Sequence, residues 1–370
     1  MSSWPKCSGR PEMRIVIMAN NIEELGGAQR VVHLLAQGLG SRGHEVVVVG
    51  IVPHATPHEY GSNAAYAMTN LLDRPYPKDD AARATLEASA TSAMQQILDS
   101  GPPGIVITAQ LWAMEHLARC RLDGWSIIGQ YHSSFEAAAS GRDLARAKAV
   151  YREIDAFALL CDEDAASFRS EGFNNVVTMP NPLADWPAEA SDSTDQLVTY
   201  LGRFSAEKGP RFLIEAWRLL AAEYPTWRLQ MVGSGPLEQQ LRDSVAGEEL
   251  SVVFLPPTRD PVGVLMGTSI LALPSLTEGF PLVLAEAMAC GVACVASDCS
   301  SGVRALVDDG RTGLIARRGD APHLAQQLAR LMDSHDLRSD LGAAARDAVQ
   351  DLRLPAVIDR WERLIANTRR

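Results

Sequence analysis

Long apolar runs are absent from this sequence of 370 residues. A helix that crosses a bilayer needs roughly 20 consecutive apolar residues, and no segment approaches that length. The opening segment MSSWPKCSGRPEM also lacks the apolar core of a secretory signal. We therefore expect a cytoplasmic protein, and the sequence leaves open whether it contacts the inner face of the membrane. Residues 1–12 are expected to form a disordered extension, unless Met13 is the true start.

Cysteine and basic residues are also too few for several classes of protein. The six cysteines form no C-x-x-C pair, which argues against a zinc site or a disulfide framework and fits a reducing compartment. Lysine and arginine together number 34 against 45 acidic residues, for a net charge of −11. A protein that binds nucleic acid needs a basic face, so we expect no nucleic-acid partner.

The sequence does contain two rounds of alternating strand and helix patterns, which predict an α/β fold. The first round begins at 14–19 and ends with a strand at 176–179. A polar stretch without periodicity follows, and the pattern restarts with a strand at 197–201. The length is sufficient for two domains, each with its own core. We predict an N-terminal domain at 1–186, a second domain at 187–354 and a C-terminal helix at 355–370.

The segment PSLTEGFPLVLAEAMACGVACVAS at 274–297 carries the strongest chemical signal. It follows an apolar run at 270–273 that is long enough for a buried strand, and it ends in a second such run at 293–297. Pro281 suits the first position of a helix. Gly291 suits the C-terminal cap of that helix. The segment is therefore predicted to form a strand–loop–helix–strand unit.

Two glutamates mark this unit. Glu278 lies in the loop, and Glu286, eight residues later, lies roughly 7 Å along the helix from its start. Each glutamate alone is more often a solvated surface carboxylate. Their spacing around an exposed Phe-Pro-Leu at a helix start instead favours a site for an elongated ligand, because helix N-termini bind phosphates and sugar oxygens. The predicted contacts between the two acids are Gly279, Phe280, Pro281, Leu282 and Val283.

The loop GRFSAEKG at 202–209 follows a strand and carries Arg203 and Lys208. Two cations on one glycine-bounded loop suit a diphosphate, because arginine can bind its oxygens bidentately and lysine acts as a point charge. Two solvated surface cations are the ordinary alternative. The next two strands lead to Gly233 and Leu255, which we expect to border the same site, with Leu255 beside a nucleobase.

The first half of the chain offers two further candidates. The loop after the first strand ends in Gly26-Gly27, where a ligand could approach the backbone closely, although a turn that requires positive φ explains the glycines equally well. This loop is not G-x-G-x-x-G, which disfavours a dehydrogenase. His132 ends a strand at the edge where open α/β sheets bind ligands, but a lone histidine is more often structural.

The strings TEGFPLVLAEAMACG and GRFSAEKG resemble the E-x7-E signature and the diphosphate loop of retaining glycosyltransferases of the family 4 type, the glycosyl transferases group 1. The resemblance covers nearly the whole chain and is strongest at 197–313. Two departures are Ala293 and Pro256-Pro257, where such proteins usually carry proline and glycine. The resemblance implies the GT-B architecture, with two Rossmann-like, doubly wound domains facing across a cleft. It also implies that the C-terminal helix packs back on the first domain.

The resemblance further assigns roles to residues. It implies that Glu278 and the amides after it hold the donor sugar, that Glu286 holds the ribose, and that His132 lies beside the transferred sugar. We assign His132 and Glu278 as positioning groups that contact the same sugar. The implied catalytic residues are His132, Glu278, Arg203 and Lys208. The implied donor-binding residues are Gly26, Gly27, Arg203, Lys208, Gly233, Leu255, Glu278, Gly279, Phe280, Pro281, Leu282, Val283 and Glu286.

We therefore expect a retaining glycosyltransferase of polysaccharide biosynthesis. It would move a sugar from a nucleotide-sugar donor, UDP-linked, to a hydroxyl of a glycan, a lipid-linked or a small-molecule acceptor. No carboxylate pair is placed for a donor-bound cation, so we expect neither a metal nor another cofactor. A sugar-nucleotide epimerase on the same architecture and a non-catalytic sugar-nucleotide-binding protein stay open as alternatives. The acceptor, the donor sugar and the oligomeric state cannot be read from the sequence, since acceptor specificity is expected in first-domain loops such as 53–78.

Overall fold

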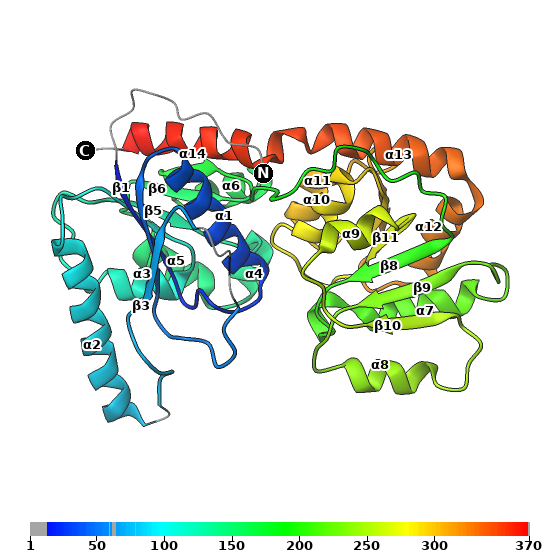
Figure 1. Ribbon diagram of the computed structural model, residues 1–370, viewed down its shortest axis with the longest axis horizontal. Coiled ribbons are helices and arrows are strands. Elements are labelled where there is room, and N and C mark those ends of the chain that lie inside the picture. Colours follow the sequence, from blue (N-terminus) through cyan, green and yellow to red (C-terminus); the bar gives the residue numbers. More distant parts are fainter. Residues whose placement is uncertain (1–12, 59, 61–63, 78, 369–370) are drawn as a thin grey trace. The chain divides into compact units, whose positions relative to one another are not determined.

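The computed structural model describes residues 13–58, 60, 64–77 and 79–368. The disorder expected for residues 1–12 lies outside the described residues. The chain divides into two compact units (Figure 1). Unit 1 comprises Met1–Pro182 and Leu354–Arg370, and unit 2 comprises Leu183–Arg353. The first crossing between units lies a few residues before the predicted boundary, and the last helix of the chain belongs to unit 1.

Unit 1 is built on a sheet of seven parallel strands in the order β3-β2-β1-β4-β5-β6-β7. All six residues of the inner strand β1, RIVIMA, are buried, as expected for a parallel strand that is covered on both faces. The strands are β1 (Arg14–Ala19), β2 (Glu45–Gly50), β3 (Ala67–Asn70), β4 (Ile105–Thr108), β5 (Ser126–Gln130), β6 (Ala156–Leu159) and β7 (Val176–Thr178).

Helices cover both faces of this sheet. Ile15 and Ile17 of β1 pack with helices α1 and α14 on one face, whereas Val16 and Met18 pack with α2, α3 and α6 on the other, because successive side chains of a strand point to opposite faces. The helices are α1 (Gly27–Ser41), α2 (Asp80–Asp99), α3 (Leu111–Leu117), α4 (Phe135–Ser140), α5 (Asp143–Val150), α6 (Asp162–Ser170) and α14 (Leu354–Thr368). Within the described ranges, no helix combines the length and the apolar character that a membrane span requires.

Helix α14 completes the core of unit 1 although it comes last in the chain. It lies alongside α1 (Figure 1), and Val357 and Trp361 are buried in the same apolar cluster as the core-facing residues of α1. At its polar side, Arg42 donates hydrogen bonds to Asp359 at 2.8 Å and to Glu362 at 3.0 Å. Apolar burial and these ion pairs together attach the C-terminal helix to unit 1.

Two stretches of unit 1 differ from what the sequence pattern suggests. The pattern at 137–154 predicts one helix, but the structure has α4 and α5, because Gly141 takes an extended conformation between them. The strand β3 lies within 53–78, where the sequence has no periodicity. Its residues are exposed or half-buried, so the alternation of apolar and polar residues that marks most strands is missing there.

Unit 2 is built on a sheet of six parallel strands in the order β10-β9-β8-β11-β12-β13. The strands are β8 (Leu197–Leu201), β9 (Arg228–Val232), β10 (Val252–Leu255), β11 (Ile270–Leu273), β12 (Ala293–Ser297) and β13 (Leu314–Ala316). The helices are α7 (Pro210–Leu220), α8 (Glu238–Val245), α9 (Pro261–Met266), α10 (Leu282–Ala289), α11 (Ser301–Leu306), α12 (Ala321–Asp333) and α13 (His335–Ala348), with 3-10 turns at Ala206–Lys208 and Gln350–Leu352.

In each sheet the strand order reverses beside one strand. The chain runs from β8 to β9 on one side and returns to place β11 on the other side of β8, and in unit 1 it places β2 and β4 on either side of β1. Ligands of doubly wound sheets bind at the carboxyl ends of the strands at such reversals. The loops that follow β1, β8 and β11 are therefore the places to examine for a site.

The chain enters and leaves unit 2 at adjacent residues. The amide of Leu183 donates a hydrogen bond to the carbonyl of Leu352 at 2.7 Å, and Leu183 forms a parallel bridge with Arg353. Beside them, the guanidinium groups of Arg346 and Arg353 lie 4.9 Å and 3.9 Å from the ring centroid of Trp186. Cation–π contacts of this kind stabilise the paired segments.

Candidate functional site

The loops after β8 and β11 meet at the carboxyl edge of the unit 2 sheet. The amide of Leu276 donates a hydrogen bond to the carbonyl of Glu207 at 2.8 Å. Gly209 has a φ of 61°, and a Cβ at this position would collide with the carbonyl oxygen of Pro274. Only glycine combines this conformation with such a close approach. The main chain thus brings the loop that carries Lys208 against the loop that carries Glu278.

Lys208 and Glu278 form an ion pair in this structure. The Nζ of Lys208 lies 2.9 Å from Oε1 and 2.8 Å from Oε2 of Glu278. The Ser275 hydroxyl donates a further hydrogen bond to Oε1 at 2.7 Å. The Glu278 side chain is 6% exposed and that of Lys208 is 33% exposed. Burial of a carboxylate to this extent is costly unless the group is paired and hydrogen-bonded, and Glu278 has both kinds of partner, so the solvated-carboxylate interpretation of Glu278 is excluded.

Arg203 projects from the same loop into solvent. Its side chain is exposed, while its carbonyl oxygen accepts a hydrogen bond from the Tyr200 hydroxyl at 2.7 Å. Burial is the main cause that raises the pKa of Tyr200, and the negative charge of Glu278 adds to it, so this hydroxyl stays protonated and keeps donating. Tyr200 therefore fixes the backbone under an arginine that is free to reach a ligand.

Helix α10 begins at Leu282, one residue later than predicted. Pro281 is its N-cap, because its ψ of 101° is extended rather than helical. The loop before it is packed closely, since a Cβ on Gly302 would collide with the carbonyl oxygen of Gly279. The first amides of an α-helix have no intrahelical acceptor, so Leu282 and Val283 offer donors here. Phe280 is buried.

Three predicted residues of unit 2 remain: Glu286 in helix α10, and Gly233 and Leu255 at the ends of two neighbouring strands. Glu286 is 7% exposed within α10, so it too is not a solvated surface carboxylate. Gly233 and Leu255 come together at the ends of β9 and β10, where the amide of Gly233 donates to the carbonyl of Leu255 at 3.0 Å. Leu255 is half-buried, and it can present its side chain to a ligand at this edge.

His132 lies in unit 1, two residues after β5. Its ring is partly buried, and its Nε2 is buried without a hydrogen-bonding partner in the described part of the chain. Burial lowers the pKa of His132 to about 4, so the imidazole is neutral at physiological pH. The preceding Tyr131 is anchored by a hydrogen bond of 3.2 Å from its hydroxyl to Asp143. A neutral ring with an unsatisfied nitrogen can make one further hydrogen bond.

Gly26 and Gly27 lie at the start of α1, where side chains from a distant segment hold the loop. The Tyr60 hydroxyl accepts a hydrogen bond from the Gly26 amide at 3.3 Å and donates one to the Glu24 carbonyl at 2.6 Å. The Tyr60 ring stacks on His33 with 4.1 Å between ring centroids. Gly26 has an extended backbone with φ of −158°, which any residue can adopt, so positive φ does not explain this glycine.

A second anchor of the same loop is Glu23. Its carboxylate accepts hydrogen bonds from the amide of His54 and from the side chain of Asn70, each at 2.9 Å. Its carbonyl oxygen accepts a third from the amide of His58 at 2.7 Å. Parts of the segment 53–78, expected to carry acceptor specificity, are thus tied to the loop that contains Gly26-Gly27.

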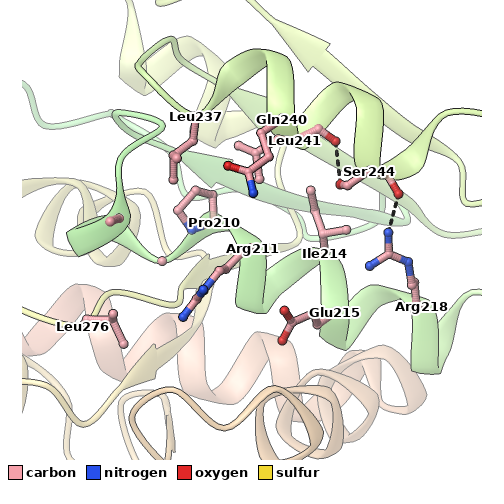
Figure 2. Close-up of a pocket in the computed structure, with 12 residues that line it drawn as sticks. Pro210, Arg211, Ile214, Glu215, Arg218, Leu237, Gln240, Leu241, Ser244 and Leu276 are labelled. Carbon is pink, nitrogen blue, oxygen red and sulfur yellow. Dashed lines mark hydrogen bonds between the residues drawn. The ribbon is translucent and has the colours of Figure 1, made fainter.

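A cavity of about 360 Å³ lies between α7 and α8 in unit 2. Figure 2 shows Pro210, Ile214, Leu237 and Leu241 lining its apolar part, with Arg211 and Glu215 along α7. It borders Gly209 and Leu276 but contains none of the predicted site residues. The arrangement that matches the sequence prediction is therefore the loop edge beside it. Among the residues that the structure describes, no cluster of three or more His, Cys, Asp or Glu side chains could hold a metal ion.

The charged residues of unit 2 were predicted from the sequence, but the residues that hold them in place were not. Ser275 lies inside the quoted motif, yet serine before a glutamate-containing loop is too common to be noticed. Tyr200 and Tyr60 are a buried strand residue and a loop residue without a local pattern. Among the predicted site residues, the structure gives direct contacts within unit 2, for Lys208 with Glu278 and for Gly233 with Leu255.

Two family models match the chain. The model described as Glycosyltransferase Family 4 matches residues 25–184, and the model described as Glycosyl transferases group 1 matches residues 185–348. An uncharacterized glycosyltransferase of Haemophilus influenzae is 28% identical over 354 residues, which is 93% of this chain and 98% of the relative. A D-inositol 3-phosphate glycosyltransferase of Corynebacterium jeikeium is 35% identical over 162 residues, which is 40% of this chain and 38% of the relative.

Solved structures with similar folds span nearly the whole chain. A mutant of TarM from S. aureus, in complex with fondaparinux, alpha-GlcNAc-glycerol and UDP, matches with a TM-score of 0.78 and 12% identity over 95% of this chain and 99% of that chain. HepE from Anabaena, in complex with UDP and glucose, matches with a TM-score of 0.77 and 17% identity over 96% and 100%. At these identities the likeness shows the fold, two Rossmann-like domains of the GT-B type.

Proposed function

Since both halves of the chain match glycosyltransferase models, the chain belongs to the family 4 type of GT-B glycosyltransferases, and we propose that it is a retaining, metal-independent enzyme. The proposed donor is a UDP-linked sugar, and the proposed acceptor is a hydroxyl group of a glycan, a lipid-linked or a small-molecule substrate. The observation that carries the proposal is the Lys208–Glu278 pair at the strand-order reversal of unit 2. In this pair, a cation suited to a diphosphate lies beside a carboxylate suited to a sugar.

Stabilisation of the leaving diphosphate is assigned to Arg203, Lys208 and the start of α10. Lys208 has three N–H donors and lies within hydrogen-bonding distance of two Glu278 oxygens, so one donor stays available for a phosphate oxygen. Arg203 is exposed and can bind bidentately. The positive end of the α10 dipole adds to these charges. Donors and charges fixed before the reaction stabilise the developing negative charge without reorganisation.

The sugar and the nucleoside are assigned to three further groups. Glu278 would accept a hydrogen bond from the donor sugar, and Glu286 would accept hydrogen bonds from the ribose. His132, neutral and with an unpartnered Nε2, would make one hydrogen bond to the transferred sugar. That His132 and Glu278 contact the same sugar stays a prediction. None of these groups is proposed as a covalent nucleophile, because a transition state with ion-pair character needs positioning and charge stabilisation.

The proposed identity of the nucleotide rests on the ligands that were bound in solved structures of similar fold. TarM and HepE were both solved with UDP, and HepE also with UDP-glucose. These complexes support UDP as the first nucleotide to test. The relatives act on acceptors as different as an inositol phosphate and an undecaprenol-linked glycan, so they favour no single acceptor for this chain.

The test is a panel of UDP-, GDP- and ADP-sugars, with UDP, GDP or ADP release measured with and without candidate acceptors. We expect slow UDP release alone, faster release with the correct acceptor, and an α-linked product from an α-linked donor. Activity should survive excess EDTA. Complete loss with EDTA, restored by Mg²⁺ or Mn²⁺, would contradict metal independence. An epimerised product without dependence on acceptor would favour the epimerase.

A further inference from the structure

The Glu278 carboxylate has little hydrogen-bonding capacity left in this structure. An ionised carboxylate offers about four acceptor positions, two on each oxygen. Oε1 accepts from the Ser275 hydroxyl at 2.7 Å and from Lys208 at 2.9 Å, which fills both of its positions. Oε2 accepts from Lys208 at 2.8 Å, which leaves one position. One oxygen is therefore closed to a ligand, and the other is half open.

We propose that Glu278 accepts a hydrogen bond from a single hydroxyl of the donor sugar, through Oε2, and that Ser275 is the positioning residue that imposes this restriction. The inference rests on the function proposed above and specifies how that site reads its sugar. A free carboxylate can bind two neighbouring hydroxyls, one on each oxygen. Because Ser275 and Lys208 occupy Oε1, Glu278 cannot accept hydrogen bonds from two neighbouring hydroxyls at the same time.

Ser275 is well placed for this role because, among the residues that the structure describes, its hydroxyl donates to Glu278 alone. The residue is fully buried two positions after the end of β11, and Glu278 lies only three residues further along the chain. Burial removes water as an alternative partner, and the charge of the acceptor makes the hydrogen bond a strong one. Lys208 spans both oxygens and so fixes the plane of the carboxylate.

The consequence is a sharp dependence on one position of the sugar ring. When the matching hydroxyl is missing from the donor, Oε2 keeps an unsatisfied acceptor in a buried site, which is costly. When a neighbouring hydroxyl is missing, Glu278 loses nothing. We expect the wild-type protein to lose roughly 10- to 100-fold in kcat/KM with one singly deoxygenated donor, the range that a hydrogen bond to a charged group implies.

The experiment compares singly deoxygenated UDP-sugars across three variants. Ser275→Ala opens the second position on Oε1. The discrimination ratio is the kcat/KM of the donor that lacks the neighbouring hydroxyl divided by the kcat/KM of the deoxy donor with the largest loss. We expect this ratio to fall about tenfold. Ser275→Cys, with a weaker donor of similar size, should give an intermediate ratio. Ser269→Ala is the matched control, because Ser269 is equally buried on the same segment but donates to the Asp195 carbonyl. It should keep the wild-type ratio.

The outcomes separate the two proposals. If the wild type turns over the parent donor but Ser275→Ala keeps the wild-type ratio while folding normally, the restriction by Ser275 is wrong. If the kcat/KM of the wild type falls equally with donors that lack either of two adjacent hydroxyls, Glu278 binds both hydroxyls and the inference also fails. If the wild type neither binds nor turns over any UDP-sugar, the proposed function itself falls. Should Ser275→Ala fail to fold, the Ser275→Cys ratio decides the question alone.

Discussion

The two units share a parallel α/β framework but hold their ligand-side loops by different means. In unit 2, the loop after β8 is bound to the loop after β11 by main-chain contacts, at Gly209 and between Glu207 and Leu276. In unit 1, side-chain contacts tie the loop after β1 to a distant segment, through the Tyr60 hydroxyl of that segment and the Glu23 carboxylate of the loop. Main-chain packing tolerates few substitutions, whereas side-chain contacts can be rebuilt with other residues. This difference agrees with the proposal that unit 2 binds the fixed diphosphate group and that unit 1 binds a variable acceptor.

Lys208→Ala is expected to have the largest effect on this comparison. It removes the proposed diphosphate cation and leaves the buried Glu278 without its ion-pair partner, so kcat/KM should fall by about 10²–10³-fold. In the double variant Lys208→Ala with Glu278→Gln, the loss of transition-state stabilisation should be smaller than the sum of the two single losses, because the two residues act as one unit. Steady-state kinetics of the double-mutant cycle measures this.

Arg203→Ala is the control for that cycle. Arg203 is exposed and lies outside the ion pair. Because it is assigned to the leaving diphosphate, its loss should raise the free energy of the transition state by about 2–4 kcal/mol and lower kcat/KM accordingly. It should add to the loss in Glu278→Gln. Full activity in both Arg203→Ala and Lys208→Ala would remove the basis for a diphosphate site on this loop.

His132→Ala tests whether unit 1 contributes to the chemical step. Turnover should fall by roughly 10²-fold, the cost of removing one transition-state hydrogen bond. UDP affinity should stay near the wild-type value, since the nucleotide is assigned to unit 2. Calorimetry with UDP beside turnover gives both quantities. Equal losses of affinity and turnover would assign His132 to the fold or to the nucleotide site instead.

The same histidine predicts a dependence of stability on pH. Its pKa is about 4 in the folded protein and about 6.5 when unfolded, because burial disfavours the charged ring. Between these values the unfolded chain binds more protons, so the free energy of unfolding falls as the pH drops from 6.5 to 4. Denaturant unfolding of the wild type and His132→Asn over this range should show a smaller fall in the variant. Parallel curves would contradict the shift.

Glu286→Ala should have an intermediate effect that is confined to the donor. A ribose contact is made equally in the ground and transition states, so KM for the donor should rise by about tenfold while kcat changes little. Glu286→Gln should recover part of the loss, since an amide oxygen still accepts a hydrogen bond. A large fall in kcat at constant KM would argue for a role in the reaction itself.

The smallest effects are expected from a matched pair of tyrosines. Tyr60→Phe removes the support of the Gly26 loop, and Tyr200→Phe removes the hydrogen bond to the Arg203 carbonyl. Each substitution should raise the free energy of the transition state by about 1 kcal/mol, the contribution of one hydrogen bond. Tyr60→Phe should lower kcat/KM for the acceptor, and Tyr200→Phe should lower it for the donor. If both variants affect the donor alone, the division of labour between the units is wrong.

The same contrast explains what could be predicted from the sequence. The loop 202–209 and the helix that starts after Pro281 were predicted because their glycines, proline and charges act on residues a few positions away. The partner of Lys208 could not be predicted, because Glu278 lies 70 residues later and only the fold brings them together. The sequence predicted Lys208 as a diphosphate group and Glu278 as a sugar group. It did not predict that the two side chains form an ion pair before any ligand binds.

In unit 1 the misses have the same origin. Tyr60 acts on Gly26 from 34 residues away, and the strand β3 is exposed, so neither leaves a periodic trace in the sequence. The break at Gly141 divides a helical pattern that continues on both sides of it. Local signals identify elements, but contacts between distant side chains decide how the loops of this unit are held.

The paired crossings at Leu183 and Leu352 have a consequence for the order in which the protein assembles during synthesis. Unit 2 is a continuous insert, complete once residue 353 has been made, whereas unit 1 still lacks α14 at that moment. The part of the apolar core of unit 1 that receives Val357 and Trp361 is therefore uncovered while the whole of unit 2 is translated, although α1 already covers the rest of that face. Domains generally fold as units during synthesis, so unit 2 is ready first and unit 1 waits for the last helix.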